Sequence, residues 1–570
     1  MCPEGRFPFW IPAAALASLC VLAAEILFFQ YLMFLTDYLT ANRVISVALL
    51  GIALGSLIAG AQMSDRRELV LRWGAVLLPA GVALAMVFGM LFPGFPAVIE
   101  IGMLVPFVGA SMILSTLIST YPSHRVYAAD LIGAGLGVLF AVVFIPLVRE
   151  EGTFVLLFCI ATVSVPLASS LLGNPKRWLN RLCAILLVIG ISFGFVNDIA
   201  DVFNFARVVL PSKDAKKIFS KYHRLTKKRK GYYLILASEG SLIERIDVMR
   251  YRRTRYATFY NGYANDHISP SRSRAYSMDL RVPVGFAENP DVLIIGTAAE
   301  GVVKTAKLAS KWPFNDGKKG KVVGLEINPA IVKIMTGPFR SYSAYAYDGI
   351  ELHVLDARSF LARDKRKFDI ITCMNTHRIT HIGAVGPPEY LHTYEGLKAI
   401  FEHLTDRGVL VLEEREITKR AEYGVARFVI TAREVLNKEF GVPYEEFPNH
   451  IAVMRWKPPR ARTWSPWTKY VQMWIKRTPF TDEDIAYFKE WRAGERPVKL
   501  KPSTRRKRMR STKFVHLPYT KSTDHIYAKA VLNPDVESVF PPSEYHMEPI
   551  TDDKPFPYDV YRYRREHIRL

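Results

Sequence analysis

Long apolar runs fill the first third of the chain and predict a helical membrane domain. A helix that crosses a bilayer needs about 20 consecutive apolar residues. Seven candidate segments are present, joined by short polar connections, at 9–36, 43–63, 70–92, 97–120, 127–148, 153–173 and 181–198. We therefore expect residues 1–198 to form a transmembrane α-helical bundle of about seven helices.

The hydrophobic pattern changes after residue 198, where the runs become short and turns separate them. Residues 199–289 begin as a basic linker and continue as runs rich in β-branched and aromatic residues. The runs at 232–238, 242–249 and 256–263 alternate as strands do. They predict a small antiparallel β-hairpin domain.

Residues 290–456 show the pattern of a parallel sheet with crossover helices. The short apolar runs are VLIIG at 292–296, VVGLEINP at 322–329, LHVLDARSF at 352–360 and FDII at 368–371. Ligands of such sheets bind at the carboxyl ends of the strands. Gly296, Glu326 and Asp356 fall at those ends and are candidate ligand-binding residues.

Residues 457–570 are rich in proline, arginine and aromatic residues, with weak periodicity, and we expect a basic C-terminal extension. The chain has a net charge of +22, and residues 1–198 contain as many acids as bases, so the excess lies on residues 199–570. This charge predicts contact with anionic lipid headgroups or with a protein partner that has an acidic surface. The basic run 501–510 has no recognised nucleic-acid-binding fold around it, so we expect no nucleic-acid partner and predict a solvated or headgroup-facing loop.

Lysine and arginine are concentrated in the N-terminal segment and in the loops on its side of the predicted bundle. The positive-inside rule places that side in the cytoplasm. With seven spans in the inner (cell) membrane, the soluble part would then be extracytoplasmic. Basic residues at 213, 216 and 217 favour the opposite orientation, and one span more or fewer would reverse the assignment.

Two acids, Glu25 and Asp130, fall within predicted spans. An ionisable group inside a membrane is costly and is a functional hypothesis by default. The alternatives are a hydrogen bond to a neighbouring helix or a position near the interface. Five cysteines without a paired pattern predict no disulfide framework, zinc knuckle or covalent haem.

The soluble part resembles the spermidine synthase (polyamine aminopropyltransferase) family, a branch of the class I methyltransferase-like, Rossmann-type fold. The resemblance rests on the order of the β-hairpin region, VLIIG, VVGLEINP, LDARSFL, FDII and the later segment LHTYEGL at 391–397. Further segments resemble the branch that is fused to an N-terminal multispan domain. They are GIALGSLIAG at 51–60, VYAADLIGAGLGVL at 126–139 and TDDKPF at 551–556.

The resemblance implies a pocket for S-adenosylmethionine or decarboxylated S-adenosylmethionine. A glycine turn at Gly296 would let the backbone approach the ligand. Glu326 would bind the ribose hydroxyls, and Asp356, with Ala357 beside it, would bind the adenine. The alternative is that these acids are solvated residues at strand ends.

The catalytic positions depart from the family's pattern. The family's turn is Gly-Gly-Gly-Asp-Gly or similar, whereas Gly296 is followed here by Thr297 and Ala298. The family's Asp-Ser-x-Asp-Pro motif has Met374 and His377 in place of its two aspartates. A thioether cannot act as the base for an attacking amine. These positions predict a catalytically degenerate protein.

A metal site could include three histidines, His377, His381 and His392. No motif such as HExxH accompanies them, so we expect no metal. The first hypothesis is a membrane-anchored pseudoenzyme that acts as a binding or scaffolding subunit of a membrane assembly. The alternative is a transferase that uses S-adenosylmethionine or its decarboxylated form on an unknown acceptor. A transporter is least favoured, because the spans contain few polar residues.

Overall fold

The computed structural model describes most of the chain. The described residues are 9–36, 38–62, 66–93, 95–173, 177–200, 204–205, 235–252, 255–260, 263–268, 282–298, 301–313, 317–374, 389–416, 419–456, 469–496 and 502–560. The chain divides into two compact units, one formed by residues 1–251 with 257–265 and the other by 252–256 with 266–570. We describe each unit by itself.

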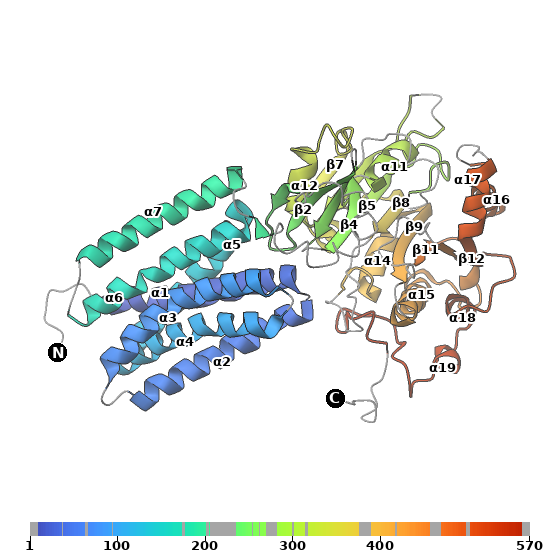
Figure 1. The fold of residues 1–570 in the computed structure, drawn as a ribbon. Coiled ribbons are helices and arrows are strands. Elements are labelled where there is room, and N and C mark those ends of the chain that lie inside the picture. The colour runs from blue at the N-terminus through green and yellow to red at the C-terminus, as the bar shows by residue number, and fades with distance from the viewer. Residues whose placement is uncertain are drawn as a thin grey trace. The chain divides into compact units, whose positions relative to one another are not determined.

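The first unit contains the predicted helical bundle (Figure 1). Its helices are α1 (Trp10–Leu35), α2 (Tyr38–Gln62), α3 (Arg67–Leu91), α4 (Pro96–Thr120), α5 (Ser123–Thr162), α6 (Ser164–Leu171) and α7 (Arg177–Ala200). Among the described residues, six helices are long and apolar enough to cross a membrane, and α5 with α6 counts as one of them. The protein is thus a multipass membrane protein with the predicted helical N-terminal region.

The first arm of α5 runs in the same direction as α1. A Cβ on Gly133 would come within 2.0 Å of the carbonyl oxygen of Ala15, and one on Gly137 within 2.4 Å of that of Leu19. From the first contact to the second, the residue numbers increase along both helices, so the two helices are parallel. Arg149 then breaks the helix with a φ of 62°, in the left-handed region that a non-glycine residue rarely adopts.

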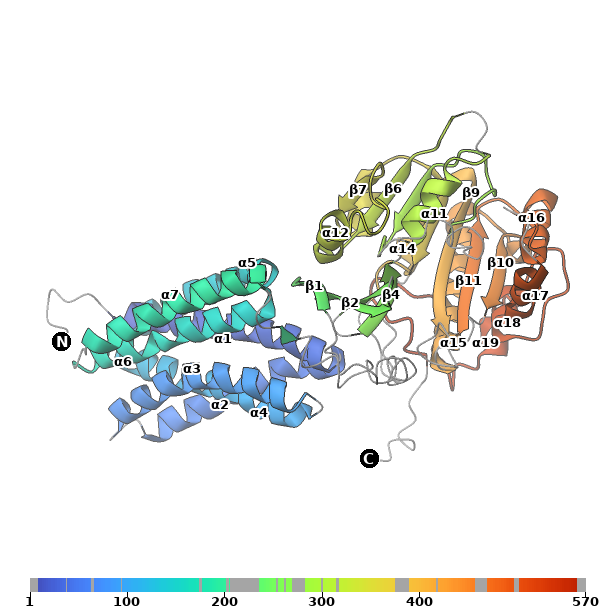
Figure 2. The ribbon, with the colours of Figure 1, turned by 45° about the horizontal axis from the view of Figure 1, so that its top comes forward.

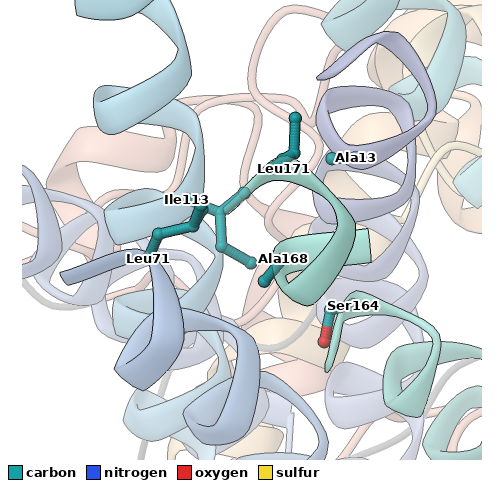
Figure 3. Close-up of a pocket in the computed structure, with 6 residues that line it drawn as sticks. All are labelled: Ala13, Leu71, Ile113, Ser164, Ala168 and Leu171. Atoms are coloured by element: carbon teal, nitrogen blue, oxygen red, sulfur yellow. The ribbon is translucent and has the colours of Figure 1, made fainter. Parts of the chain in front are cut away.

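The second arm of α5 returns along α1 in the opposite direction. Phe154 stacks on Phe28 near the C-terminal end of α1, with ring centroids 5.8 Å apart. Farther along the chain, Ala168 of α6 lines a small pocket with Ala13 near the N-terminal end of α1 (Figure 3). The 49-residue stretch is therefore a helical hairpin, and its two arms correspond to the predicted spans 127–148 and 153–173.

A four-stranded sheet follows the helices, with the order β1-β2-β3-β4. Its strands are β1 (Ile235–Glu239), β2 (Ile246–Arg252), β3 (Arg255–Tyr260) and β4 (Tyr263–Ile268). β1 pairs antiparallel with β2. The three predicted strand segments overlap the first three of these strands, and β4 extends the sheet beyond the prediction.

The second unit is built on an eight-stranded sheet (Figure 2). Its strands are β5 (Val292–Ile295), β6 (Val322–Glu326), β7 (Glu351–Val354), β8 (Phe368–Met374), β9 (Leu404–Glu416), β10 (Ile451–Trp456), β11 (Lys469–Lys476) and β12 (Thr512–His516). The order is β12-β10-β11-β9-β8-β5-β6-β7, in which β5 to β9 are parallel and β11 is antiparallel to β9. If β5 is counted as strand 1 and the sheet is followed from β7, the first seven strands have the order 3-2-1-4-5-7-6, with strand 7 antiparallel. This is the strand order of the predicted class I methyltransferase-like fold.

Helices cover both faces of this sheet (Figure 2). They are α11 (Gly301–Ala309), α12 (Pro329–Thr336), α13 (Ala357–Arg363), α14 (Tyr394–Glu402), α15 (Lys419–Phe440), α16 (Asp482–Ala493), α17 (Pro502–Ser511), α18 (Ile526–Leu532) and α19 (Val536–Val539). The main core joins α13, α14, α15 and α18 to one face of the sheet. α11 contacts β5 and β6 on the other face.

Two strands of this sheet come from the segment that we expected to be an extension. β11 lies between β9 and β10, and β12 pairs with the outer side of β10. β11 is buried on both faces through most of its length, so its sequence lacks the alternation of a half-exposed strand. Residues 502–510 of the basic run also do not form the predicted loop, because they lie in helix α17.

Candidate functional sites

Gly296 forms the predicted turn at the carboxyl end of β5. Its φ is 81°, which favours glycine because a Cβ is strained there. The backbone N–H groups of Gly296 and Thr297 both donate to the carbonyl oxygen of Leu325 on β6, across 3.0 and 3.2 Å. The turn therefore crosses directly over the neighbouring strand, towards Glu326.

Both carboxylate oxygens of Glu326 accept hydrogen bonds from the chain itself. The hydroxyl of Thr297 and the N–H of Ala298 donate to Oε2 across 3.2 and 3.0 Å, and the N–H of Asn328 donates to Oε1 across 3.0 Å. The residue is only 7 % exposed. These three donors occupy most of the roughly four lone-pair sites of the carboxylate, so few remain for the ribose hydroxyls of a nucleoside.

Thr297 fills space beside this carboxylate. Its side chain is fully buried, and a Cβ added to Gly324 of β6 would lie 2.8 Å from its methyl group. The hydroxyl of Tyr347 donates to the Thr297 hydroxyl across 2.9 Å and to the carbonyl oxygen of Ala298 across 2.5 Å. A threonine side chain thus lies where the family has glycine, and a tyrosine that the sequence did not single out holds it in place.

Asp356 and Ala357 lie at the start of α13, after the carboxyl end of β7. Asp356 is exposed, and its side chain accepts from the backbone N–H of Ser359 across 3.0 Å. This is an N-cap, so the acid has a structural role in starting the helix. Ala357 is buried beneath it.

The family resemblance would place an acceptor at the carboxyl ends of β8 and β9, which we call the acceptor side. Met374 is the last residue of β8, whereas His377 and His381 lie outside the described residues. Cys373 is buried just before Met374. Burial raises the pKa of the Cys373 thiol, and the nearby carboxylates of Glu389 and Glu414 raise it further. The thiol is therefore held in its neutral form, which is a poor nucleophile.

His392 is buried beside Glu389, with Nδ1 3.6 Å from Oε1 of the carboxylate. Its ring also packs against Phe428, with the centroids 4.8 Å apart. Within the described part of the chain, no group of three or more histidine, cysteine, aspartate or glutamate residues could hold a metal ion.

The two predicted intramembrane acids differ in their surroundings. Asp130 accepts a hydrogen bond from the hydroxyl of Ser18 on α1, so it ties two helices together. Glu25 is half-buried on α1 and has no hydrogen-bond or ion-pair partner among the described residues. The small pocket in the bundle is lined by aliphatic residues and Ser164, whose hydroxyl already donates to the carbonyl oxygens of Ala75 and Ala161 (Figure 3). This pocket offers no polar pathway for a solute.

A buried ionic cluster lies at the turn of the α5 hairpin and was missed at the sequence level. Arg245, in the connection between β1 and β2, donates from Nη1 to Glu150 and Glu151, each across 2.8 Å, and from Nε to Asp247 across 3.1 Å. Its Nη2 donates to Asn204 across 2.8 Å. The three acids and the arginine are almost completely buried. The sequence predicts that Glu150 and Glu151 lie in a short connection between two spans, and their spacing does not indicate an arginine partner far along the chain.

No protein-family model matches the chain. An uncharacterized protein of Methanocaldococcus jannaschii is 30% identical over 98 residues, which are 17% of this chain and 25% of that protein, so the match spans about a quarter of the relative's length.

Solved structures that are similar to the chain include spermidine synthases. The enzyme from Thermotoga maritima is 17% identical, with 52% of this chain and 87% of that chain covered and a TM-score of 0.34. A probable spermidine synthase from Corynebacterium glutamicum is 13% identical, with 52% and 99% covered and a TM-score of 0.31. By its own sheet topology, the chain combines an α/β domain of the class I methyltransferase type with a multispan membrane region.

Proposed function

We propose that this protein is a membrane-anchored, catalytically degenerate spermidine synthase-like protein whose α/β domain acts as a binding or scaffolding subunit of a membrane assembly. The observation that carries this proposal is that Glu326 already accepts hydrogen bonds from within the chain. Its two carboxylate oxygens are already hydrogen-bonded to the chain's own groups, and Thr297 is packed beside them. The ribose of a nucleoside would have to compete with these contacts for the carboxylate.

The acceptor side supports the same proposal. Aminopropyl transfer needs a general base that takes a proton from the attacking amine. This base must have a suitable pKa and must lie within hydrogen-bond distance of the amine. Met374 supplies a thioether at that position, and His377 replaces the second acid. Cys373 cannot substitute as a nucleophile, because its thiol is buried beside two carboxylates.

A turnover assay tests the proposal. Purified full-length protein is incubated with decarboxylated S-adenosylmethionine and putrescine, and the release of methylthioadenosine is measured, with an active spermidine synthase as the positive control. We expect no release above that of a protein-free sample. Sustained release that scales with the concentration of this protein would overturn the assignment as a pseudoenzyme.

The second candidate function is a transferase that uses S-adenosylmethionine or its decarboxylated form on another acceptor. Two features favour it: Gly296 keeps the left-handed turn, and Asp356 is exposed at the adenine side of the fold. This candidate requires nucleoside binding that depends on Asp356. Calorimetry separates it from the scaffold, as described at the end of the Discussion.

We also propose that the bundle lies in the inner membrane with the α/β domain outside the cytoplasm. The α5 hairpin supports an odd number of crossings, since its two arms run in opposite directions along α1. The positive-inside rule then gives the orientation. In spheroplasts, external protease should digest residues 199–570, and protection of these residues until the membrane is permeabilised would refute the orientation.

The excess positive charge on the soluble part supports contact with anionic headgroups or with an acidic protein surface. Arg506 on α17 and Lys513 on β12 are two exposed members of this basic surface. In vesicles that contain the protein, phosphatidylglycerol should protect the α17 region from hydrogen exchange relative to phosphatidylcholine, and 0.5 M salt should remove the difference. Equal exchange in both lipids would exclude the headgroup contact.

A further inference from the structure

Residues 546–560 form a closed segment, which we call the C-terminal strap. The N–H of His546 donates to the carbonyl oxygen of Val560 across 3.0 Å, so the two ends of the strap meet. Between them, the carbonyl oxygen of Ile550 accepts from Tyr394 and that of Pro555 accepts from Glu389, both across 2.7 Å. The strap therefore runs along residues 389–394, the segment that leads into α14.

A buried arginine holds the strap from below. Arg427 of α15 donates from Nη1 to the carbonyl oxygens of Phe556, Pro557 and Asp559, across 2.9 to 3.3 Å, and from Nε to that of Glu548 across 3.1 Å. Burial lowers the pKa of Arg427 to about 10, which leaves it charged at neutral pH. In the closed state, these contacts hold the backbone of the strap against α15.

An ion pair joins the strap to the nucleoside side of the fold. Nη1 and Nη2 of Arg358 each donate to one carboxylate oxygen of Asp552, both across 3.0 Å, and Thr393 donates to the same carboxylate across 2.6 Å. Arg358 lies on α13, two residues after Asp356. The strap therefore reaches the helix that carries the adenine-side residues.

Tyr558 is the side chain by which the strap enters the acceptor side. It is 5 % exposed, and its ring lies against α15, where a Cβ on Gly424 would come 2.4 Å from its Cδ1. Its hydroxyl lies 3.5 Å from Oε2 of Glu414, near the end of β9. Cys373 of β8 pairs with Leu412 of β9, two residues before Glu414, so the Cys373 thiol and the Tyr558 hydroxyl both lie beside this stretch of β9.

We propose that the C-terminal strap is a built-in occupant of the acceptor side: when closed, Tyr558 fills the space at the carboxyl ends of β8 and β9, and release of Asp552 from Arg358 lets the strap lift and uncover Cys373, Glu389 and Glu414. This rests on the proposed use of the α/β domain for binding, and it assigns a closing device to the same edge of the sheet. The carboxyl edge is where ligands of such sheets bind, so its occupation by the chain itself regulates access.

The test is the rate at which a small thiol reagent modifies Cys373 in the full-length protein, followed by peptide mass spectrometry. Asp552→Asn removes the charge from the ion pair while keeping the shape of the side chain. We expect Cys373 to react about two- to fivefold faster in this variant. One partly exposed ion pair stabilises the closed strap by an energy that corresponds to this factor in the local opening equilibrium. Cys20, Cys159 and Cys183 of the helical unit serve as internal references.

Asp348→Asn is the matched control. Asp348 forms a similar bidentate pair with Arg340, across 3.1 and 2.8 Å, and its side chain is 36 % exposed against 37 % for Asp552. This control should leave the reactivity of Cys373 unchanged. Equal rates in the wild type and the Asp552→Asn variant, or an equal increase in both variants, would overturn the proposal.

A second pair of variants guards against a trivial loss of folding. Tyr558→Phe keeps the ring and should keep Cys373 protected, whereas Tyr558→Ala should expose it while the thermal midpoint still shows a folded protein. Protection that survives Tyr558→Ala would contradict a role for the ring. These outcomes are independent of the proposed function, because turnover or nucleoside binding by the wild type would overturn the pseudoenzyme and leave the thiol measurements unaffected.

Discussion

Nη1 of Arg245 donates to Oε2 of Glu150 across 2.8 Å, although the two residues lie 95 positions apart in the sequence. The contact ties the connection between β1 and β2 to the turn of the α5 hairpin. Gln30 of α1 supports the same connection, since it donates to the carbonyl oxygen of Leu242 across 2.7 Å. The β1–β2 connection therefore belongs structurally to the helical unit, in which it contacts the C-terminal half of α1 and the turn of the α5 hairpin.

Replacing Arg245 by methionine should destabilise the helical unit strongly. The carboxylates of Glu150, Glu151 and Asp247 would remain buried without the arginine, and breaking such a buried ion pair costs about 3–5 kcal/mol. The measurement is the thermal midpoint of the full-length protein in detergent. Arg72→Met is the control: Arg72 pairs with Glu68 on an exposed helix surface at 3.6 Å, and its loss should cost less than about 1 kcal/mol. Equal shifts in the two variants would contradict the buried cluster.

The parallel packing of α1 and the first arm of α5 predicts a sharp difference between two glycines. Gly133→Ala would place a Cβ 2.0 Å from the carbonyl oxygen of Ala15, so the helices would have to separate, at a cost of about 1–3 kcal/mol. Gly135→Ala would meet nothing within 4 Å and should be neutral or slightly stabilising. Thermal midpoints of both variants in one detergent provide the measurement, and a neutral Gly133→Ala would refute the packing.

The contribution of Glu422 to the stability of the α/β unit should fall as the pH rises from 5 to 8. Burial, together with a hydrogen bond to Glu416, raises the pKa of Glu422 from 4.5 to about 7. Burial opposes ionisation of Glu416 too, but its contacts with Arg455 outweigh burial and hold its pKa at about 2. Two carboxylates therefore compete for the guanidinium of Arg455, and Glu422 is the one that takes up a proton.

The sign of the effect follows from linkage. The folded state binds the Glu422 proton more tightly than the unfolded state, so this contribution is complete below about pH 4.5 and is lost as the pH rises through about 7. Because the side chain is partly exposed, solvent screening reduces the effect to about 1 kcal/mol. Glu422→Gln should flatten the pH dependence of the thermal midpoint, whereas the exposed Glu445→Gln should not. An unchanged slope in Glu422→Gln would remove Glu422 as the cause.

Local patterns in the sequence predicted much of the α/β fold. The runs ending at Gly296 and Glu326 form β5 and β6, because strand propensity and the turn glycine act over a few residues. The place of β11 between β9 and β10 could not be predicted in this way. It depends on pairing with strands that lie far away in the sequence, and a strand buried on both faces shows no alternation.

Residues of the candidate sites could be predicted only where they lie in a local sequence motif. Glu326 and Asp356 are found from their positions at strand ends, but their partners are not. Tyr347 lies 50 residues from Thr297, and Tyr558 lies 144 residues from Glu414. Such contacts are set by the tertiary packing of the whole unit, so neither tyrosine could be assigned from spacing.

The most direct test of the self-filled nucleoside site is isothermal titration calorimetry on the purified full-length protein. S-adenosylmethionine, decarboxylated S-adenosylmethionine and methylthioadenosine are each titrated into the wild type and into Asp356→Ala. The contacts of Glu326 with Thr297, Ala298 and Asn328 predict no binding heat from any of the three compounds. Micromolar binding to the wild type that is lost in Asp356→Ala would contradict this account and favour the transferase instead.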